Sequence, residues 1–125
     1  MSDKSSDIHD AVTDYCENRL GSPKEFPFKT TSRVYKVAGK MYACIAEDRD
    51  PRLLSIKLPP EEGLALRAEH PDHIMPGYHL NKQHWNSIVL DGTLDDDFVL
   101  ALVRQSYDTV VAGLPKKQRP PEPPG

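Results

Sequence analysis

Three short apolar runs follow one another closely, and they constrain the possible folds more than any other feature of the chain. They occupy residues 33–37, 41–47 and 53–58. A glycine-containing turn at 38–40 separates the first two, and a charged loop, "EDRDPR", separates the second from the third. Connections this short join antiparallel neighbours, whereas parallel strands need a long crossover. The pattern therefore predicts three consecutive antiparallel strands.

Alternation within these runs predicts which side chains face the core. Residues 41–47 are apolar on both sides, which is typical of a central strand. In each of the other two runs, one side of the strand is more apolar than the other. The side chains expected to point inward are those of Leu54, Ile56 and Leu58. Those expected to point outward are Ser55 and Lys57. In the first run, Tyr35 and Val37 share one face of the strand, and Val34 and Lys36 share the other.

Helical patterns lie on either side of these strands. Residues 5–20 repeat apolar side chains at helical spacing, with Ser5 or Ser6 as the expected N-cap. Residues 59–71 predict a short helix that starts with prolines and acids. Residues 93–114 predict the longest helix, with a broad apolar arc.

The order of these elements predicts an α+β fold. A further strand is expected near residues 86–90, so the order is helix, three strands, helix, one or two strands, helix. An antiparallel sheet with helices packed on one face would bury every apolar arc. A chain of 125 residues suits one core, and we expect a single domain over residues 1–115. The proline-rich ending, residues 116–125, is predicted to be disordered.

The composition is that of a soluble globular protein. Hydrophobic residues make up 38% and charged residues 28%, and no apolar run has the length of a membrane span. The acidic start, "MSDKSSDIHD", lacks the apolar segment of a secretory signal. Cys16 and Cys44 both fall within apolar patterns, and we expect them to be reduced thiols. We therefore expect a cytoplasmic monomer without a membrane partner.

Charge is distributed unevenly along the chain. The formal net charge of −3 argues against a general nucleic-acid binder, because such domains are commonly basic. Residues 24–57 nevertheless carry eight Lys/Arg against four Asp/Glu, a local +4, whereas residues 58–115 carry three against nine, a local −6. This pattern is compatible with an anionic partner on one face. Chance segregation of solvated charges explains it equally well.

The segment "PGYHLNKQHWNSIVLDG" gathers groups with recognition chemistry. It holds the only tryptophan of the chain and two of its five histidines. Lys82 suits a phosphate, Asn81 suits a base edge, and Tyr78 or Trp85 suits base stacking. Cations on the predicted strands and their loops would extend such a contact along phosphates. These cations are Lys36, Lys40, Arg49, Arg52 and Lys57.

A structural interpretation of the same segment is also open. Trp85 at the start of a strand is expected to be a core residue, because an indole buries a large area in a small domain. Asn81 and His84 would then satisfy backbone groups of the turn. For Lys82 and the strand cations, neither interpretation prevails.

Metal and catalytic chemistry have weaker signals. Histidines lie close together in one region, where a carboxylate such as Asp72 could join them around a transition metal. They are His70, His73, His79 and His84. The acids at 95–97 are explained by the positive end of a helix, and the Ser106 hydroxyl is expected to bond the carbonyl of Leu102. We predict no metal site, no cofactor and no enzymatic activity.

Several of these stretches, in this order, resemble the MmcQ/YjbR family. They are "FPF", "VYKVAGKMYA", "LLSIKLPPEE", "PGYHLNKQHWNSIVLDG" and "SYDTVV" followed by "LPKK", spanning roughly residues 10–117. "PGYHLNKQHW" with the later "SYD" is the most specific part. The resemblance implies a CyaY/frataxin-like fold and a DNA-binding, double-wing assignment, and it supplies no catalytic residues.

The resemblance and the residues together lead us to expect a non-enzymatic binding module with DNA as its partner. The expected contact residues are Lys36, Lys40, Arg52, Lys57, Asn81, Lys82 and His84. The alternative is a protein-interaction or metal-handling module on the same fold. The frataxin-like fold would imply iron on an acidic ridge of the first helix, although any solvent-facing helix side has such acids. The ridge would consist of Asp7, Asp10, Asp14 and Glu17.

Overall fold

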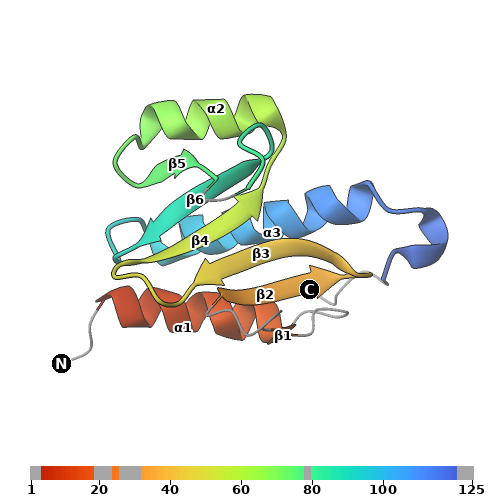
Figure 1. Cartoon of the computed structure of the whole chain (residues 1–125), viewed down its shortest axis with the longest axis horizontal. Coiled ribbons are helices and arrows are strands. Elements are labelled where there is room, and N and C mark those ends of the chain that lie inside the picture. Colours follow the sequence, from red (N-terminus) through yellow and green to blue (C-terminus); the bar gives the residue numbers. More distant parts are fainter. Residues whose placement is uncertain (1–3, 19–23, 26–31, 78–79, 121–125) are drawn as a thin grey trace.

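The computed structural model describes residues 4–18, 24–25, 32–77 and 80–120 (Figure 1). The helices are α1 (Lys4–Glu17), α2 (Pro60–Glu69) and α3 (Asp96–Ala112). The strands are β1 (Lys24–Glu25), β2 (Ser32–Val37), β3 (Lys40–Ala46), β4 (Arg52–Lys57), β5 (Ile74–Pro76) and β6 (Trp85–Leu90). This order confirms the predicted α+β fold.

All the strands belong to one antiparallel sheet, in the order β1-β2-β3-β4-β6-β5. The three predicted neighbours are β2, β3 and β4. Ala38 and Gly39 join β2 to β3 with φ values of 50° and 77°, the left-handed conformation that tight hairpin turns require. The chain leaves β4 through α2 and returns along the sheet edge as β5 before it enters β6 (Figure 1).

Helices α1 and α3 lie together across one face of the sheet, and α2 lies along the edge formed by β5 (Figure 1). The ring of His70, at the end of α2, lies 5.3 Å from that of Phe98 in α3. Every side chain predicted to point inward is buried between the helices and the sheet. The largest fully buried side chains are Tyr35, Tyr42, Ile8, Ile45, Leu54, Ile56, Leu58, Ile74, Ile88, Leu90, Val12 and Val37.

The face opposite the helices is more buried than the alternation predicts. Ser55 points away from the core as expected, yet only 5% of it is exposed. Its hydroxyl lies 2.8 Å from the hydroxyl of Ser87, its cross-strand neighbour on β6. The two hydroxyls satisfy each other, which makes their burial possible.

The ends of the chain differ from the prediction. Helix α1 already includes Lys4, so neither Ser5 nor Ser6 is its N-cap, and its expected end at residue 20 lies outside the described residues. Composition predicts disorder from residue 116, but Lys116–Gln118 form a 3-10 helix. Residues 121–125 lie outside the described residues. In the described ranges, no helix combines the length and apolar character of a membrane crossing.

Candidate binding site at the end of the sheet

A pocket of about 300 Å³ opens where β3 begins and β4 ends. The strands supply one wall, formed by Lys40, Met41, Lys57 and Trp85. The last part of α3 and the residues after it supply the other, formed by Thr109, Val110, Gly113 and Leu114. The pocket therefore brings two of the expected contact lysines together with the only tryptophan.

The pocket exists because β3 and β4 stop pairing before they end. Their ladder joins Ala43–Ala46 to Leu53–Ile56 and goes no further. The pairing of β2 with β3 also shifts by one residue at this point, which makes Tyr42 the extra residue of a β-bulge. A bulge bends its strand and ends regular pairing locally, so the first residues of β3 diverge from the end of β4.

Ser106 of α3 takes the place of the missing strand pair. Its hydroxyl donates to the carbonyl of Tyr42 at 2.6 Å and accepts the backbone N–H of Lys57 at 2.7 Å. The predicted bond to the Leu102 carbonyl is therefore wrong, because this buried hydroxyl instead serves two backbone groups that the bulge leaves without strand partners. The inserted hydroxyl bridges the two strands at the inner end of the pocket.

The positive charges of the pocket are available to a ligand. Lys40 is exposed and Lys57 is half-buried. Neither ammonium group makes a hydrogen bond or ion pair with any residue that the structure describes. Two cations that are not neutralised by nearby acids attract an anionic group.

The end of α3 does not need these lysines as caps. Cations near a helix C-terminus often serve its unpaired carbonyls. Here Gly113 N–H bonds the Val110 carbonyl at 3.1 Å, and Arg119 donates to the carbonyls of Ala112 and Leu114 at 3.2 and 3.0 Å. Arg119 therefore supplies the capping charge, and Lys40 and Lys57 remain free for another role.

Trp85 lies in the wall of the pocket and not in the core. It is half-buried and pairs with Lys57 across β4 and β6. Ile88 faces the core from the same strand, so residue 86 shares that side and Trp85 points to the opposite one. The prediction of a core tryptophan is wrong for this reason of strand parity. The indole thus becomes part of a partly open surface.

The loop before Trp85 uses its polar groups internally. The Asn81 side-chain oxygen accepts the N–H of Gln83 at 2.9 Å, and the Asn81 carbonyl accepts the N–H of Trp85 at 2.9 Å. The exposed Lys82 donates from Nζ to the Gly77 carbonyl at 3.0 Å. These bonds confirm the turn-stabilising interpretation of Asn81. Another expected stacking residue, Tyr78, lies outside the described residues, as does His79.

Gly77 allows this loop to close against β6. Its N–H bonds the carbonyl of Trp85 at 2.9 Å. A Cβ at position 77 would lie 2.7 Å from the Cβ of Trp85 and 3.0 Å from its carbonyl oxygen. Only glycine permits so close an approach without a shift of the neighbouring chain. The glycine of the "PGYHLNKQHW" motif therefore helps to place the tryptophan.

Arg67 of α2 is a positioning residue that sequence reasoning missed. Its Nε donates to Asn86 Oδ1 at 2.7 Å, and its Nη2 donates to the carbonyls of Lys82 and Trp85. The buried Asn86 also has α2 directly above it, because a Cβ on Gly63 would come within 2.8 Å of its side-chain oxygen. One guanidinium thus ties α2 to both ends of the loop. No local pattern identifies this role, since a single arginine in a short helix is usually solvated.

The remaining expected contacts lie at different distances from the pocket. Lys36 is close to it, because it pairs in register with Met41 of the wall. The carbonyl of His84 accepts the N–H of Leu58 at 2.8 Å, which joins the loop to the chain after β4. Lys36 and the loop that contains His84 therefore border the pocket without lining it.

Arg52 is not brought to this site. It starts β4, whereas Lys57 ends it, a separation of roughly 17 Å at the usual rise per strand residue. Its Nε lies 3.3 Å from Glu47 Oε1, and the same carboxylate lies 2.6 Å from His9 Nε2 and 3.2 Å from Arg33 Nε. Arg52 therefore belongs to a charge cluster that joins α1 to the other end of the sheet.

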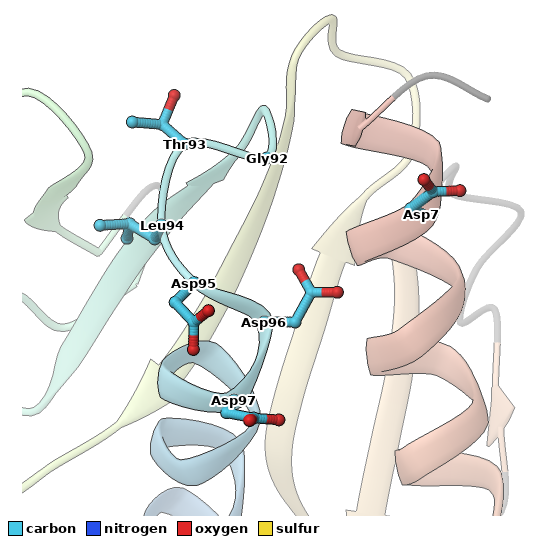
Figure 2. Close-up of a pocket in the computed structure, with 7 residues that line it drawn as sticks. All are labelled: Asp7, Gly92, Thr93, Leu94, Asp95, Asp96 and Asp97. Atoms are coloured by element: carbon cyan, nitrogen blue, oxygen red, sulfur yellow. The ribbon is translucent and has the colours of Figure 1, made fainter. Parts of the chain in front are cut away.

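A second pocket lies at that opposite end and is acidic. Its volume is about 450 Å³, and it is lined by Asp7 of α1 and by Gly92, Thr93, Leu94, Asp95, Asp96 and Asp97 (Figure 2). The carboxylates in Figure 2 point in different directions. Among the described residues, no group of three or more His, Cys, Asp or Glu is arranged to hold a metal ion. Asp96 and Asp97 lie in the first turn of α3, where the helix dipole favours negative charge.

Asp91 precedes this acidic loop and has its own partners. Its carboxylate accepts the N–H of Thr93 at 2.9 Å and lies 3.1 Å from His73 Nε2. Partial burial alone would raise the pKa of Asp91, but the hydrogen bonds from Thr93 and the neighbouring His73 outweigh it, so the pKa lies below its usual value. His73 therefore has a structural partner at this end of β6.

Comparison with known proteins identifies close relatives. The family model for YjbR matches residues 21–109, a span that includes Lys40, Lys57 and Trp85. The Escherichia coli K12 protein YjbR is 33% identical over 105 residues, which cover 84% of this chain and 88% of the relative. The E. coli O157:H7 protein YbdF is 31% identical over 94 residues, covering 75% and 76% of the two chains.

Solved structures agree with this relationship. A crystal structure of a Deinococcus radiodurans protein with a DUF419 domain superposes with a TM-score of 0.83 at 40% identity, covering 89% of this chain and 84% of that one. A Pseudomonas syringae crystal structure gives a TM-score of 0.67 at 25% identity, covering 80% and 96%. The sequence match and the shared fold lead to one conclusion: this chain belongs to the YjbR family.

Proposed function

We propose that this protein is a non-enzymatic binding module for nucleic acid, and that the pocket between β3, β4 and the end of α3 is its contact surface. One observation carries the proposal: two lysines without partners among the described residues line the same pocket as the only tryptophan. Ammonium groups suit phosphates, and a partly exposed indole suits a base. No chemical step is assigned to these groups.

Further exposed cations lie close to lining residues along the chain and support the same partner. Lys82 is exposed on the loop before Trp85, and Lys116 and Lys117 are exposed directly after the pocket residue Leu114. A nucleic acid presents a row of phosphates, so several separate cations can each meet one. A compact anion would engage only the lysines inside it.

The acidic net charge does not oppose this proposal, because part of the negative charge gathers at the opposite end of α3. The α3 helix begins at Asp96, beside the aspartates that line the acidic pocket, and its last residues line the basic pocket. Separation of charge along one axis orients an approaching polyanion toward the positive end. We expect nucleic acid to bind at that end despite the net charge of −3.

A pair of charge-matched variants tests the proposal. Lys40→Gln with Lys57→Gln removes two positive charges from the pocket, and Arg49→Gln with Arg104→Gln removes two from exposed positions outside its lining. Affinity for a labelled mixed-sequence oligonucleotide is measured by fluorescence anisotropy across a salt series. The pocket variant should bind more weakly and lose about 1.4 from the slope of log K against log salt, about 0.7 for each lost phosphate contact on a single strand. Equal losses in both variants would contradict the assigned surface.

An acidic protein segment is the second candidate partner. The pocket wall includes the apolar side chains of Met41, Val110 and Leu114, which would suit an apolar residue flanked by acids. A protein that binds no oligonucleotide at low salt but binds an acidic peptide through Lys40 and Lys57 would favour this candidate.

A further inference from the structure

We infer that the pocket holds one unpaired base, so that the protein prefers single-stranded nucleic acid to duplex. This inference rests on the proposed function and adds the form of nucleic acid that the site selects. It depends on the shape of the pocket, on the separation of its apolar and charged groups, and on the fixed position of its walls.

The shape of the site suits a base that has left its stack. Proteins that read duplex DNA commonly insert a projecting helix or ribbon into a major groove about 12 Å wide. The site here is a hollow of about 300 Å³ between strand ends and a helix, the size of a small pocket for small molecules. A base within a duplex must be unstacked and unpaired before it enters a hollow, whereas a single strand offers bases without that cost.

The lining separates into an apolar part and a charged part. Val110 and Leu114 are only 6% and 5% exposed, so they form a closed apolar floor from the helix side. Trp85 stands in the opposite wall beside its cross-strand partner Lys57. An aromatic side chain that faces an apolar floor across the pocket suits the face of a base, and the two ammonium groups suit the phosphates on either side of it.

The walls are fixed before a ligand arrives. The Ser106 hydroxyl holds the backbone of Lys57 at 2.7 Å. The N–H of Trp85 is held by the Asn81 carbonyl at 2.9 Å, and its carbonyl is held by Gly77 and Arg67 at 2.9 and 3.0 Å. Groups that are already ordered lose little freedom on binding, which favours recognition of a single base.

The test compares three ligands with equal numbers of phosphates. They are a single-stranded deoxyoligonucleotide, the same strand with abasic sites in place of its bases, and a duplex of matched total phosphate number. Because Trp85 is the only tryptophan, its fluorescence reports directly on stacking in the pocket. We expect the single strand to quench this emission and to bind about tenfold more tightly than the abasic strand, the range of one stacked base. The duplex should bind more weakly than the single strand.

Each outcome has a distinct meaning. If all three ligands bind equally, the base-binding inference is overturned, but the proposed phosphate-binding function stands. If none binds at low salt, both the inference and the proposed function are wrong. If the single strand binds more tightly but leaves Trp85 emission unchanged, the base lies outside this pocket and the inference fails.

A pair of substitutions places the effect on the ring itself. Trp85→Phe keeps an aromatic face and should retain most of the preference for the single strand over the abasic strand, measured by anisotropy of the labelled ligand. Trp85→Leu should lose that preference while it keeps the affinity for the abasic strand. A Trp85→Leu protein with an unchanged preference would overturn the inference. The comparison of ligands on the unsubstituted protein does not depend on how either variant folds.

Discussion

Ser106 bridges β3 and β4 at the point where the pocket opens between them. Its hydroxyl satisfies a carbonyl on β3 and an N–H on β4 where the two strands have separated. Removal of the hydroxyl leaves two backbone groups without this partner. The cost of an unsatisfied buried group is about 1–3 kcal/mol, so Ser106→Ala should lower the free energy of unfolding by about that amount. Urea denaturation measures this change.

Thr109→Val is a matched control for that prediction. Thr109 lies one turn further along α3, and its hydroxyl only bonds the carbonyl of Gln105 within the same helix. That carbonyl keeps its backbone partner when the hydroxyl is lost, so we expect a change of less than about 0.5 kcal/mol. Similar losses in the two variants would show that Ser106 has no special role between β3 and β4.

Asp91 gives the protein a defined response to acid. Its pKa is lowered in the folded protein, so the folded state favours the ionised carboxylate relative to the unfolded chain. This contribution is fully present above the unfolded pKa of about 3.9 and is lost as the pH falls through the lower folded value. The group is about one-third exposed, which limits the contribution to about 1 kcal/mol.

Asp91→Asn should therefore remove part of the acid sensitivity. We expect the variant to be slightly less stable than the parent at pH 7 and to lose less stability between pH 4.5 and 2.5 (approximate limits set by the unfolded pKa). Urea midpoints measured across this range give the comparison. A parent and variant with parallel pH profiles would exclude Asp91 as a contributor.

At the scale of the elements, α2 and the loop before β6 behave as one unit because Arg67 joins them. Its guanidinium contacts Asn86, Lys82 and Trp85 through a fork of donors. Arg67→Lys keeps the charge but loses the fork, so it should cost about 1–3 kcal/mol and speed amide exchange at Gly77 and Trp85. The control is Arg104→Lys, since Arg104 is exposed and lies 3.8 Å from Asp108 in a surface ion pair. Unchanged exchange in Arg67→Lys would contradict this link.

The sequence is sufficient to predict the elements, because their signals are local. The strands β2, β3 and β4 follow from short apolar runs, and the turn at Ala38 and Gly39 follows from a glycine between two such runs. The orientation of side chains in β6 could not be predicted from the sequence. Asn86, Ser87 and Ile88 are consecutive and all buried, so alternation does not indicate to which face of the sheet Trp85 points.

The candidate site is less predictable because its contacts join distant parts of the chain. Ser106 meets a carbonyl 64 residues away, and Arg67 meets Asn86 at a distance of 19 residues. The Tyr42 carbonyl at the bulge is satisfied by a residue of α3, and nothing within the sequence of β3 indicates that contact. The sequence alone identifies lysines and a tryptophan as candidate ligand-binding residues. Tertiary packing determines that Lys40 and Lys57 share a pocket, whereas Arg52 pairs with Glu47 elsewhere.

At the scale of the whole molecule, charge is separated along α3. The acidic pocket lies at the start of this helix (Figure 2), and the basic pocket lies at its end. A polyanion should therefore approach the end that carries Lys40, Lys57 and Trp85 and avoid the end that carries the aspartates. Because surface fields are screened within about 8 Å at physiological salt, the preference should weaken as salt rises.

An amide chemical-shift titration with a single-stranded oligonucleotide, at low and then physiological salt, tests the central claim most directly. We expect shifts at Lys40, Met41, Lys57, Trp85 and residues 109–114 that diminish as salt is added, with residues 91–97 unaffected. No shifts at low salt, or shifts centred on the acidic end, would contradict the assignment of this pocket as a nucleic-acid site.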